Sequence, residues 1–233
     1  CLAYVVMTPI EIQAILQYSS HFFPFLLIKQ VSYFKLSSIG YLVAIAIMFF
    51  IVLLNSYGIK FLAECNKYAS IVKFILPSIA IFSLIHVSSS LGNIAIDLGT
   101  KKSWIDIFSA LSAGGIAFAF TGFQNGLMLA GEVKNPQKSI PIAILGAVLI
   151  GFILYFMLQF SFLIAIPKSY LQQGWQQLSF PGDSGPLVGL TLLLGLSIVA
   201  NLLLFDAACA PLGSSLVYTA ATCRVLYGMA LDK

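Results

Sequence analysis

Long uninterrupted runs of apolar residues constrain this chain more than any other feature. Runs such as 40–57 and 141–166 approach or exceed the length needed, because about 20 helical residues cross about 30 Å of hydrocarbon. Charged residues make up only 9% of the 233 residues, whereas soluble domains carry about 25%. The runs are continuous rather than alternating, which is not typical of a transmembrane β-barrel. We therefore expect an all-α fold, a polytopic transmembrane helical bundle.

Six candidate spans follow from the apolar runs and the polar connections between them. A single helix over 186–227 would be about 60 Å long, which is twice the thickness of the hydrocarbon core. We expect instead a short helix at 186–194 that leads into the last span. The predicted spans are 1–20, 40–57, 69–86, 107–131 with a break near 119–125, 141–166 and 195–227.

Composition and motifs exclude several classes of function. The net charge of +4 is dispersed, so no nucleic-acid partner is expected. Four scattered cysteines without a C-x-x-C pair predict neither a metal site nor a disulfide framework. The sequence holds no phosphate-binding G-x-x-x-x-G-K-[ST] motif and no H-E-x-x-H or G-x-S-x-G motif. We therefore predict no enzyme, no ATP-driven pump and no cofactor, and we expect membrane lipid as a partner.

The segment 112–131, SAGGIAFAFTGFQNGLMLAG, is apolar enough to span a membrane but has an unusual middle. Two glycines flank two amides there, Gln124 and Asn125, and both kinds of residue are costly in a membrane helix. Close helix packing is one interpretation, because Gly122-x-x-x-Gly126 spaces small residues by four. The other is an unwound segment that lines a cavity. Exposed backbone N–H groups at such a break attract a carboxylate, as in many transporters.

The segment that follows this helix carries a resemblance to a known family. The stretch 132–144, EVKNPQKSIPIAI, fits without a gap the E-V-K-N-P-x-x-x-I-P-x-A-I loop of the amino acid–polyamine–organocation superfamily. Four other segments resemble motifs of the same superfamily: TPIE at 8–11, NSYGIK at 55–60, SIVK at 70–73 and RVLYGMA at 224–230.

The resemblance implies a partial leucine-transporter-type fold built from two inverted repeats. On this register the chain covers about helices three to eight of twelve, so helices one, two and nine to twelve are missing. We therefore expect that the chain alone cannot transport. The resemblance also implies a bacterial inner (plasma) membrane protein, and it places the substrate-binding break on Phe118, Ala119, Phe120, Thr121, Gly122, Phe123 and Gln124.

Lys73 is the sharpest single candidate, because it lies within the apolar run 71–76. A lysine in hydrocarbon is a functional candidate by default, and burial lets it gain and lose a proton near neutral pH. In proton-coupled relatives, the resemblance implies, a lysine here takes the place of a sodium ion. Ser214 and Ser215 are then candidate partners. The alternative is a lysine that extends to the headgroups.

Two acids in apolar surroundings remain without an assigned role. Asp206 precedes Pro211, which favours a helix cap or bend, and Glu11 is expected to pair with a missing helix. The predicted function is secondary transport of an amino acid or related amine, by symport with protons. The alternatives are an amino acid or polyamine antiporter of the same superfamily and a non-transporting fragment.

Overall fold

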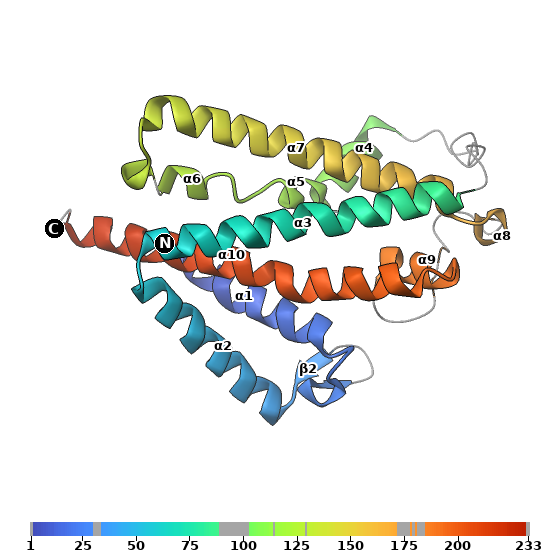
Figure 1. Ribbon diagram of the computed structural model, residues 1–233, viewed down its shortest axis with the longest axis horizontal. Helices are drawn as coiled ribbons and strands as arrows, with labels where there is room; N and C mark the ends of the chain where they lie inside the picture. Colours follow the sequence, from blue (N-terminus) through green and yellow to red (C-terminus); the bar gives the residue numbers. More distant parts are fainter. Residues whose placement is uncertain are drawn as a thin grey trace. The chain divides into compact units, whose positions relative to one another are not determined.

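The computed structural model describes residues 2–29, 34–88, 103–113, 115–128, 130–171, 178, 180 and 185–231. The chain divides into two compact units. The first comprises Cys1–Ser83 with Phe180–Lys233, and the second comprises Leu84–Ser179. Long helices dominate both units (Figure 1), so the predicted all-α class is confirmed.

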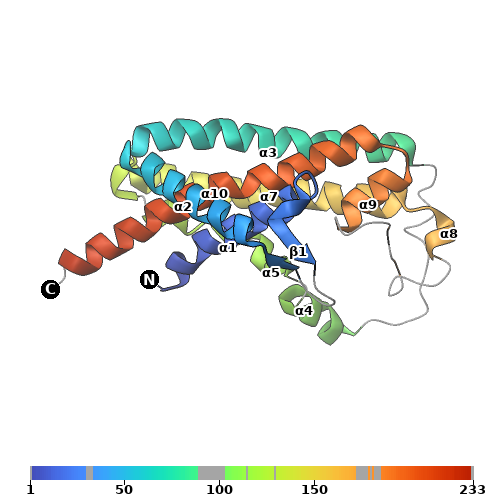
Figure 2. The ribbon, with the colours of Figure 1, turned by 90° about the horizontal axis from the view of Figure 1, so that it is seen from below.

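The first unit is built around two helices that pack along each other, α1 (Leu2–Ser19) and α10 (Ser197–Leu231). Figure 2 shows them side by side as in Figure 1. A hydrogen bond of 3.1 Å between the hydroxyl groups of Thr8 and Thr219 joins these helices. The short helix α9 (Pro186–Leu193) precedes α10 and contributes Val188 to a buried cluster with Leu203 and Leu204.

Two further long helices belong mainly to this unit, α2 (Ser38–Ser56) and α3 (Ile59–Val87). Helix α3 begins ten residues before the span expected at 69–86, because the polar segment from Ile59 onward continues as helix without an internal glycine or proline before Pro77. Ala80 of α3 is fully buried in the same cluster as Leu204. This contact fixes α3 against α9 and α10.

A small hairpin lies in the connection between the first two predicted spans, 1–20 and 40–57. The 3-10 helix η1 (Pro24–Leu26) leads into β1 (Leu27–Lys29), which pairs antiparallel with β2 (Phe34–Leu36). Ser37 then caps α2, because its hydroxyl oxygen accepts a 2.9 Å hydrogen bond from the Gly40 N–H. This cap sets the start of α2 at Ser38.

The second unit contains the segment that the sequence marked as a broken span. The described helices of this second unit are α4 (Trp104–Ala113), α5 (Ile116–Ala119), α6 (Asn125–Met128), the 3-10 helix η3 (Ala130–Glu132), α7 (Pro136–Ala165) and α8 (Lys168–Leu171). Helix α7 starts at Pro136, five residues before the span predicted at 141–166. Proline is favourable in the first helical turn, since the N–H that it lacks would have no partner there.

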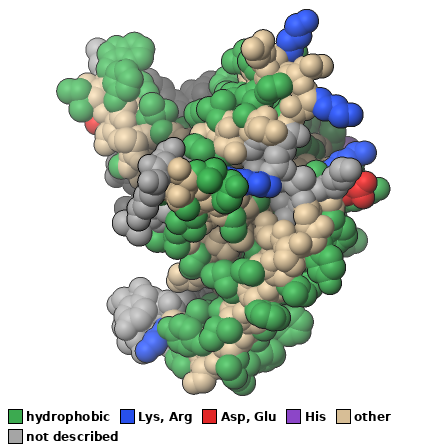
Figure 3. Space-filling model, turned by 90° about the vertical axis from the view of Figure 1, so that its left-hand side faces the viewer, with side chains coloured by type: hydrophobic (Ala, Val, Ile, Leu, Met, Phe, Trp, Pro, Cys, Tyr) green, Lys and Arg blue, Asp and Glu red, His purple; other side chains and the backbone are tan. Residues whose placement is uncertain are grey.

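Among the described residues, four helices are long and apolar enough to cross a membrane: Ser38–Ser56, Asn66–Val87, Pro136–Ala165 and Ser197–Leu231. Large apolar side chains lie exposed on them, including Phe49 at 68%, Phe82 at 73% and Ile198 at 76%. Hydrophobic side chains also predominate on the face drawn in Figure 3. Apolar surface of this extent is typical of contact with lipid or with other membrane helices.

Candidate transport sites

The first candidate site is the break between α5 and α6. Helix α5 ends at Ala119, α6 begins at Asn125, and the five residues between them form turns. Gly122 lies in this segment with φ of 105°, a conformation that residues with a side chain rarely adopt. The structure therefore opens the helix at the place that the glycine and amide pattern indicated. The structure thus shows the unwound backbone of the second interpretation, and the cavity that it would line stays a prediction.

One polar group of the opened backbone is satisfied locally. The Gly122 N–H donates a 2.9 Å hydrogen bond to Oε1 of Gln124, two residues further along the chain. In a continuous helix, the Gly122 N–H would donate to the carbonyl four residues earlier. Here the side-chain amide of Gln124 accepts that hydrogen bond instead. Gln124 belongs to the predicted substrate-binding set, and in this structure its side chain stabilises the turn itself.

A residue that the sequence did not single out contacts the break from the neighbouring helix. The Tyr155 hydroxyl of α7 donates a 3.4 Å hydrogen bond to the carbonyl of Ala119, where α5 ends. The Tyr155 ring also meets the Phe120 ring edge-on, with centroids 5.4 Å apart. No sequence motif marks Tyr155, since one tyrosine in the apolar run 141–166 resembles any other interfacial or packed aromatic residue.

The remaining residues of the break differ in environment. The Phe123 side chain is 48% exposed, and Thr121 lies in the turn. Phe118 belongs to α5, and its side chain lies outside the described part of the structure. Asn125 follows directly and is only 7% exposed, and its Oδ1 has no hydrogen-bond partner among the described residues.

The second candidate site lies in the first unit, around Lys73 of α3. Its ammonium group donates a 3.4 Å hydrogen bond to the hydroxyl oxygen of Ser214 on α10, 141 residues away in sequence. Ser215, the other predicted partner, is fully buried, and its hydroxyl donates a 2.8 Å hydrogen bond to the Leu212 carbonyl of its own helix. The structure therefore brings Lys73 to Ser214 and turns Ser215 to a different face.

Two carboxylates act on this ammonium group. Glu11 of α1 and Asp206 of α10 both interact electrostatically with Lys73. All three side chains are partly buried, so solvent screens their charges less than it screens surface charges. We call Lys73, Ser214, Glu11 and Asp206 the lysine cluster. From the sequence, Glu11 is expected to pair with a missing helix and Asp206 to cap or bend a helix. Neither acid is predicted to interact with Lys73.

A proline stands one helical turn beyond the lysine. Pro77 lies inside α3, four residues after Lys73. Since proline has no N–H, the Lys73 carbonyl lacks its usual helical donor, and such positions bend helices. The lysine cluster therefore lies at a point where α3 is weakened.

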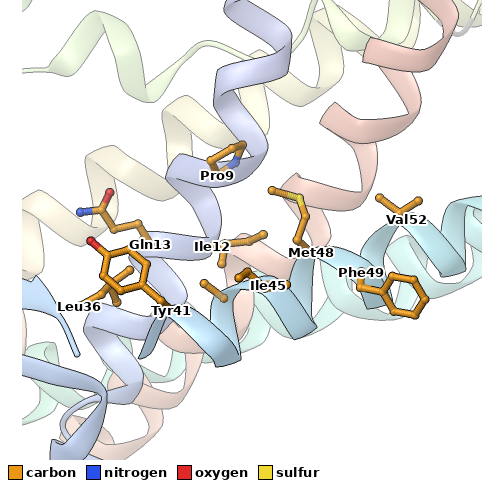
Figure 4. Close-up of a pocket in the computed structure, with 10 residues that line it drawn as sticks. Pro9, Ile12, Gln13, Leu36, Tyr41, Ile45, Met48, Phe49 and Val52 are labelled. Atoms are coloured by element: carbon orange, nitrogen blue, oxygen red, sulfur yellow. The ribbon is translucent and has the colours of Figure 1, made fainter. Parts of the chain in front are cut away.

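A groove of about 530 Å³ opens elsewhere in the first unit, between α1 and α2. Figure 4 shows its walls, with Pro9 and Ile12 facing Ile45 and Met48. Gln13 and Tyr41 contribute polar atoms, and the other residues that line it are apolar. It holds no titratable cluster of the kind found at Lys73. Within the described part of the chain, no group of three or more His, Cys, Asp or Glu residues is placed to hold a metal ion.

In the part of the chain that the structure describes, four helices are long and apolar enough to cross a membrane, and Lys73 of one of them bonds to Ser214 of another. A further apolar segment is opened between α5 and α6. These features define the chain as part of a polytopic membrane protein of the transporter type. A family model described as "Amino acid permease" matches residues 1–233. The chain therefore belongs to the amino acid permease family and is part of an integral, multi-pass protein of the bacterial plasma membrane.

Two curated relatives from Bacillus subtilis (strain 168) align with nearly all of the chain. The "Glutamate/serine transporter AimA" is 32% identical over 240 residues, which cover 100% of this chain and 43% of that protein. The "Aspartate-proton symporter" is 32% identical over 229 residues, which cover 98% of this chain and 43% of that protein. The chain thus spans less than half the length of the curated relatives it matches.

Proposed function

We propose that the protein containing this chain is a secondary transporter that moves amino acids across the plasma membrane together with protons. Membership of the amino acid permease family supports transport of amino acids. One relative is named for glutamate and serine, and the other for aspartate and protons. Acidic and small polar amino acids are therefore the substrate class that we propose.

The break between α5 and α6 is the proposed substrate site. A zwitterionic amino acid needs donors for its carboxylate and acceptors for its ammonium group, and an opened helix supplies both from its backbone. The buried Oδ1 of Asn125, unpaired among the described residues, adds one acceptor beside the break. Residues 118–124 would then contact the substrate, and Asn125 extends this set.

The contact between Lys73 and Ser214 carries the proposal of proton coupling. A charged ammonium group makes a stronger hydrogen bond than a neutral amine. Loss of the proton would therefore loosen the contact between α3 and α10, at the point where Pro77 already weakens α3. Glu11 and Asp206 interact electrostatically with Lys73, and they are the carboxylates that would receive its proton.

Uptake by the full-length transporter in proteoliposomes tests this function. Lys73→Met keeps the length of the side chain and removes its charge. We expect it to lower uptake driven by a pH gradient by about 10-fold or more, since a hydrogen bond to a charged group contributes about 1.5–3 kcal/mol. Exchange of labelled for unlabelled amino acid should continue. Lys67→Met is the matched control, because Lys67 is an exposed lysine on the same helix.

Each unexpected outcome has a definite meaning. If uptake changes neither with the pH gradient nor with Lys73→Met, proton symport is rejected and the antiporter is favoured. No amino acid transport or binding by the wild-type protein would reject the proposed function as a whole.

A further inference from the structure

Gly213, which precedes Ser214 on α10, lies directly beside α3. A side-chain carbon on Gly213 would lie 3.3 Å from Nζ of Lys73, 3.2 Å from Oδ1 of Asn66 and 3.5 Å from Cβ of Ala69. Residues 66, 69 and 73 are spaced so that they share one face of a helix. Three residues on one face of α3 therefore lie beside a single glycine of α10.

The space left by the missing side chain is narrow and polar. Two of its three neighbours are the lysine ammonium and an amide oxygen, at separations tighter than ordinary van der Waals contact. The Lys73–Ser214 hydrogen bond is already 3.4 Å long, and hydrogen bonds weaken beyond about 3.2 Å. A displacement of a few tenths of an ångström would therefore break it.

We propose that Gly213 is a positioning residue for proton coupling: it leaves the space through which the Lys73 ammonium reaches α10, and Asn66 closes that space as a second polar neighbour. This inference rests on the proposed role of Lys73. Glu11 from α1 and Asp206 from α10 are the charged groups that act on the same ammonium. A side chain at position 213 separates the ammonium from Ser214 and leaves both carboxylates in place.

The test compares two glycines of the same helix in the full-length transporter. Gly213→Ala introduces a methyl group beside Lys73, whereas Gly228→Ala introduces one where nothing lies within 4 Å. Both changes replace a glycine of α10 with alanine, and they differ chiefly in the contact with α3. We expect Gly213→Ala to lower gradient-driven uptake by about 10-fold and to flatten its pH dependence. Exchange should be retained, and Gly228→Ala should behave as wild type.

A double variant shows whether Gly213 acts through the lysine. With Lys73→Met in place, adding Gly213→Ala should cause little further loss, because the contact is already absent. Full additivity of the two losses would overturn the inference. So would a Gly213→Ala protein with the pH dependence of the wild type.

A second variant keeps the inference testable if Gly213→Ala does not fold. Asn66→Ala removes the amide oxygen without adding volume, and it should flatten the pH dependence by a smaller amount, with exchange unchanged. An unaltered pH profile in Asn66→Ala would remove Asn66 from the arrangement. If Lys73→Met itself leaves the pH dependence intact, the proposed coupling fails. If Lys73→Met changes the pH dependence but Gly213→Ala and Asn66→Ala do not, only the proposed role of Gly213 is rejected.

Discussion

The break and the lysine cluster are assembled in opposite ways. The break is contiguous in sequence: the Gly122 N–H is satisfied two residues away by Gln124, and Tyr155 contacts the Ala119 carbonyl from α7. The lysine cluster joins α1, α3 and α10, and Lys73 and Ser214 lie 141 residues apart. One site depends on the conformation of a short backbone segment, and the other depends on how helices pack.

This difference determines which substitutions should affect each site. At the break, the function would lie in backbone groups, so a change in permitted φ matters more than a change in side-chain chemistry. At the lysine cluster, the function would lie in side-chain charge and in one hydrogen bond. Substitutions that separate backbone effects from side-chain effects therefore test the comparison directly.

The largest effect is expected at the break from Gly122→Ala. Gly122 has φ of 105°, and a residue with a side chain held in such a conformation costs about 1–3 kcal/mol. The turn should therefore change shape, and both amino acid binding and uptake should fall by about 5- to 100-fold. Binding of labelled amino acid to the purified full-length transporter measures the loss directly.

Gly126→Ala is the matched control for Gly122→Ala. Gly126 lies in α6, and a side-chain carbon there would meet nothing within 4 Å. Its substitution should leave binding nearly unchanged. Equal losses in the two variants would mean that the backbone conformation of Gly122 is not what the substrate requires.

A smaller effect, confined to coupling, is expected from Ser214→Ala in the lysine cluster. The substitution removes the oxygen that accepts from Lys73 and leaves the lysine in place. Loss of one such bond should lower gradient-driven uptake by about 5- to 10-fold without a matching loss of substrate binding. Ser215→Ala is the control, since that hydroxyl bonds within its own helix. If Ser215→Ala alone impaired coupling, Ser215 and not Ser214 would be the serine that acts with Lys73.

The sequence predicted the break better than it predicted the surroundings of the lysine. Gly122 and Gln124 are neighbours in the chain, so their pattern reveals an opened helix before any packing is known. The electrostatic interaction of Glu11 with Lys73 and the approach of Lys73 to Gly213 depend on how α1, α3 and α10 pack, which periodicity along one helix cannot specify. For the same reason Lys73 was a candidate on its own, while only one of its two predicted serine partners lies beside it.

The fold shows the same division between local and distant information. The apolar runs predicted the all-α class, and the short helix expected before the last span is present as α9. The hairpin between β1 and β2 was missed, because two three-residue strands leave no detectable alternation. The early start of α3 was missed as well, because polar residues such as Glu64 and Asn66 are compatible with both a loop and a helix that extends beyond the membrane.

The smallest effect is expected from Tyr155→Phe, which tests whether the break depends on any side chain outside it. The variant loses the 3.4 Å hydrogen bond to the Ala119 carbonyl and keeps the ring against Phe120. A bond of this length contributes about 0.5 kcal/mol, so KM should rise about two- to threefold with kcat nearly unchanged. Tyr155→Leu removes the ring contact too, and its larger rise in KM would show that α7 holds the break in shape. If both variants match the wild type, the turn is maintained by its own residues, Gly122 and Gln124, and the contrast with the lysine cluster becomes sharper.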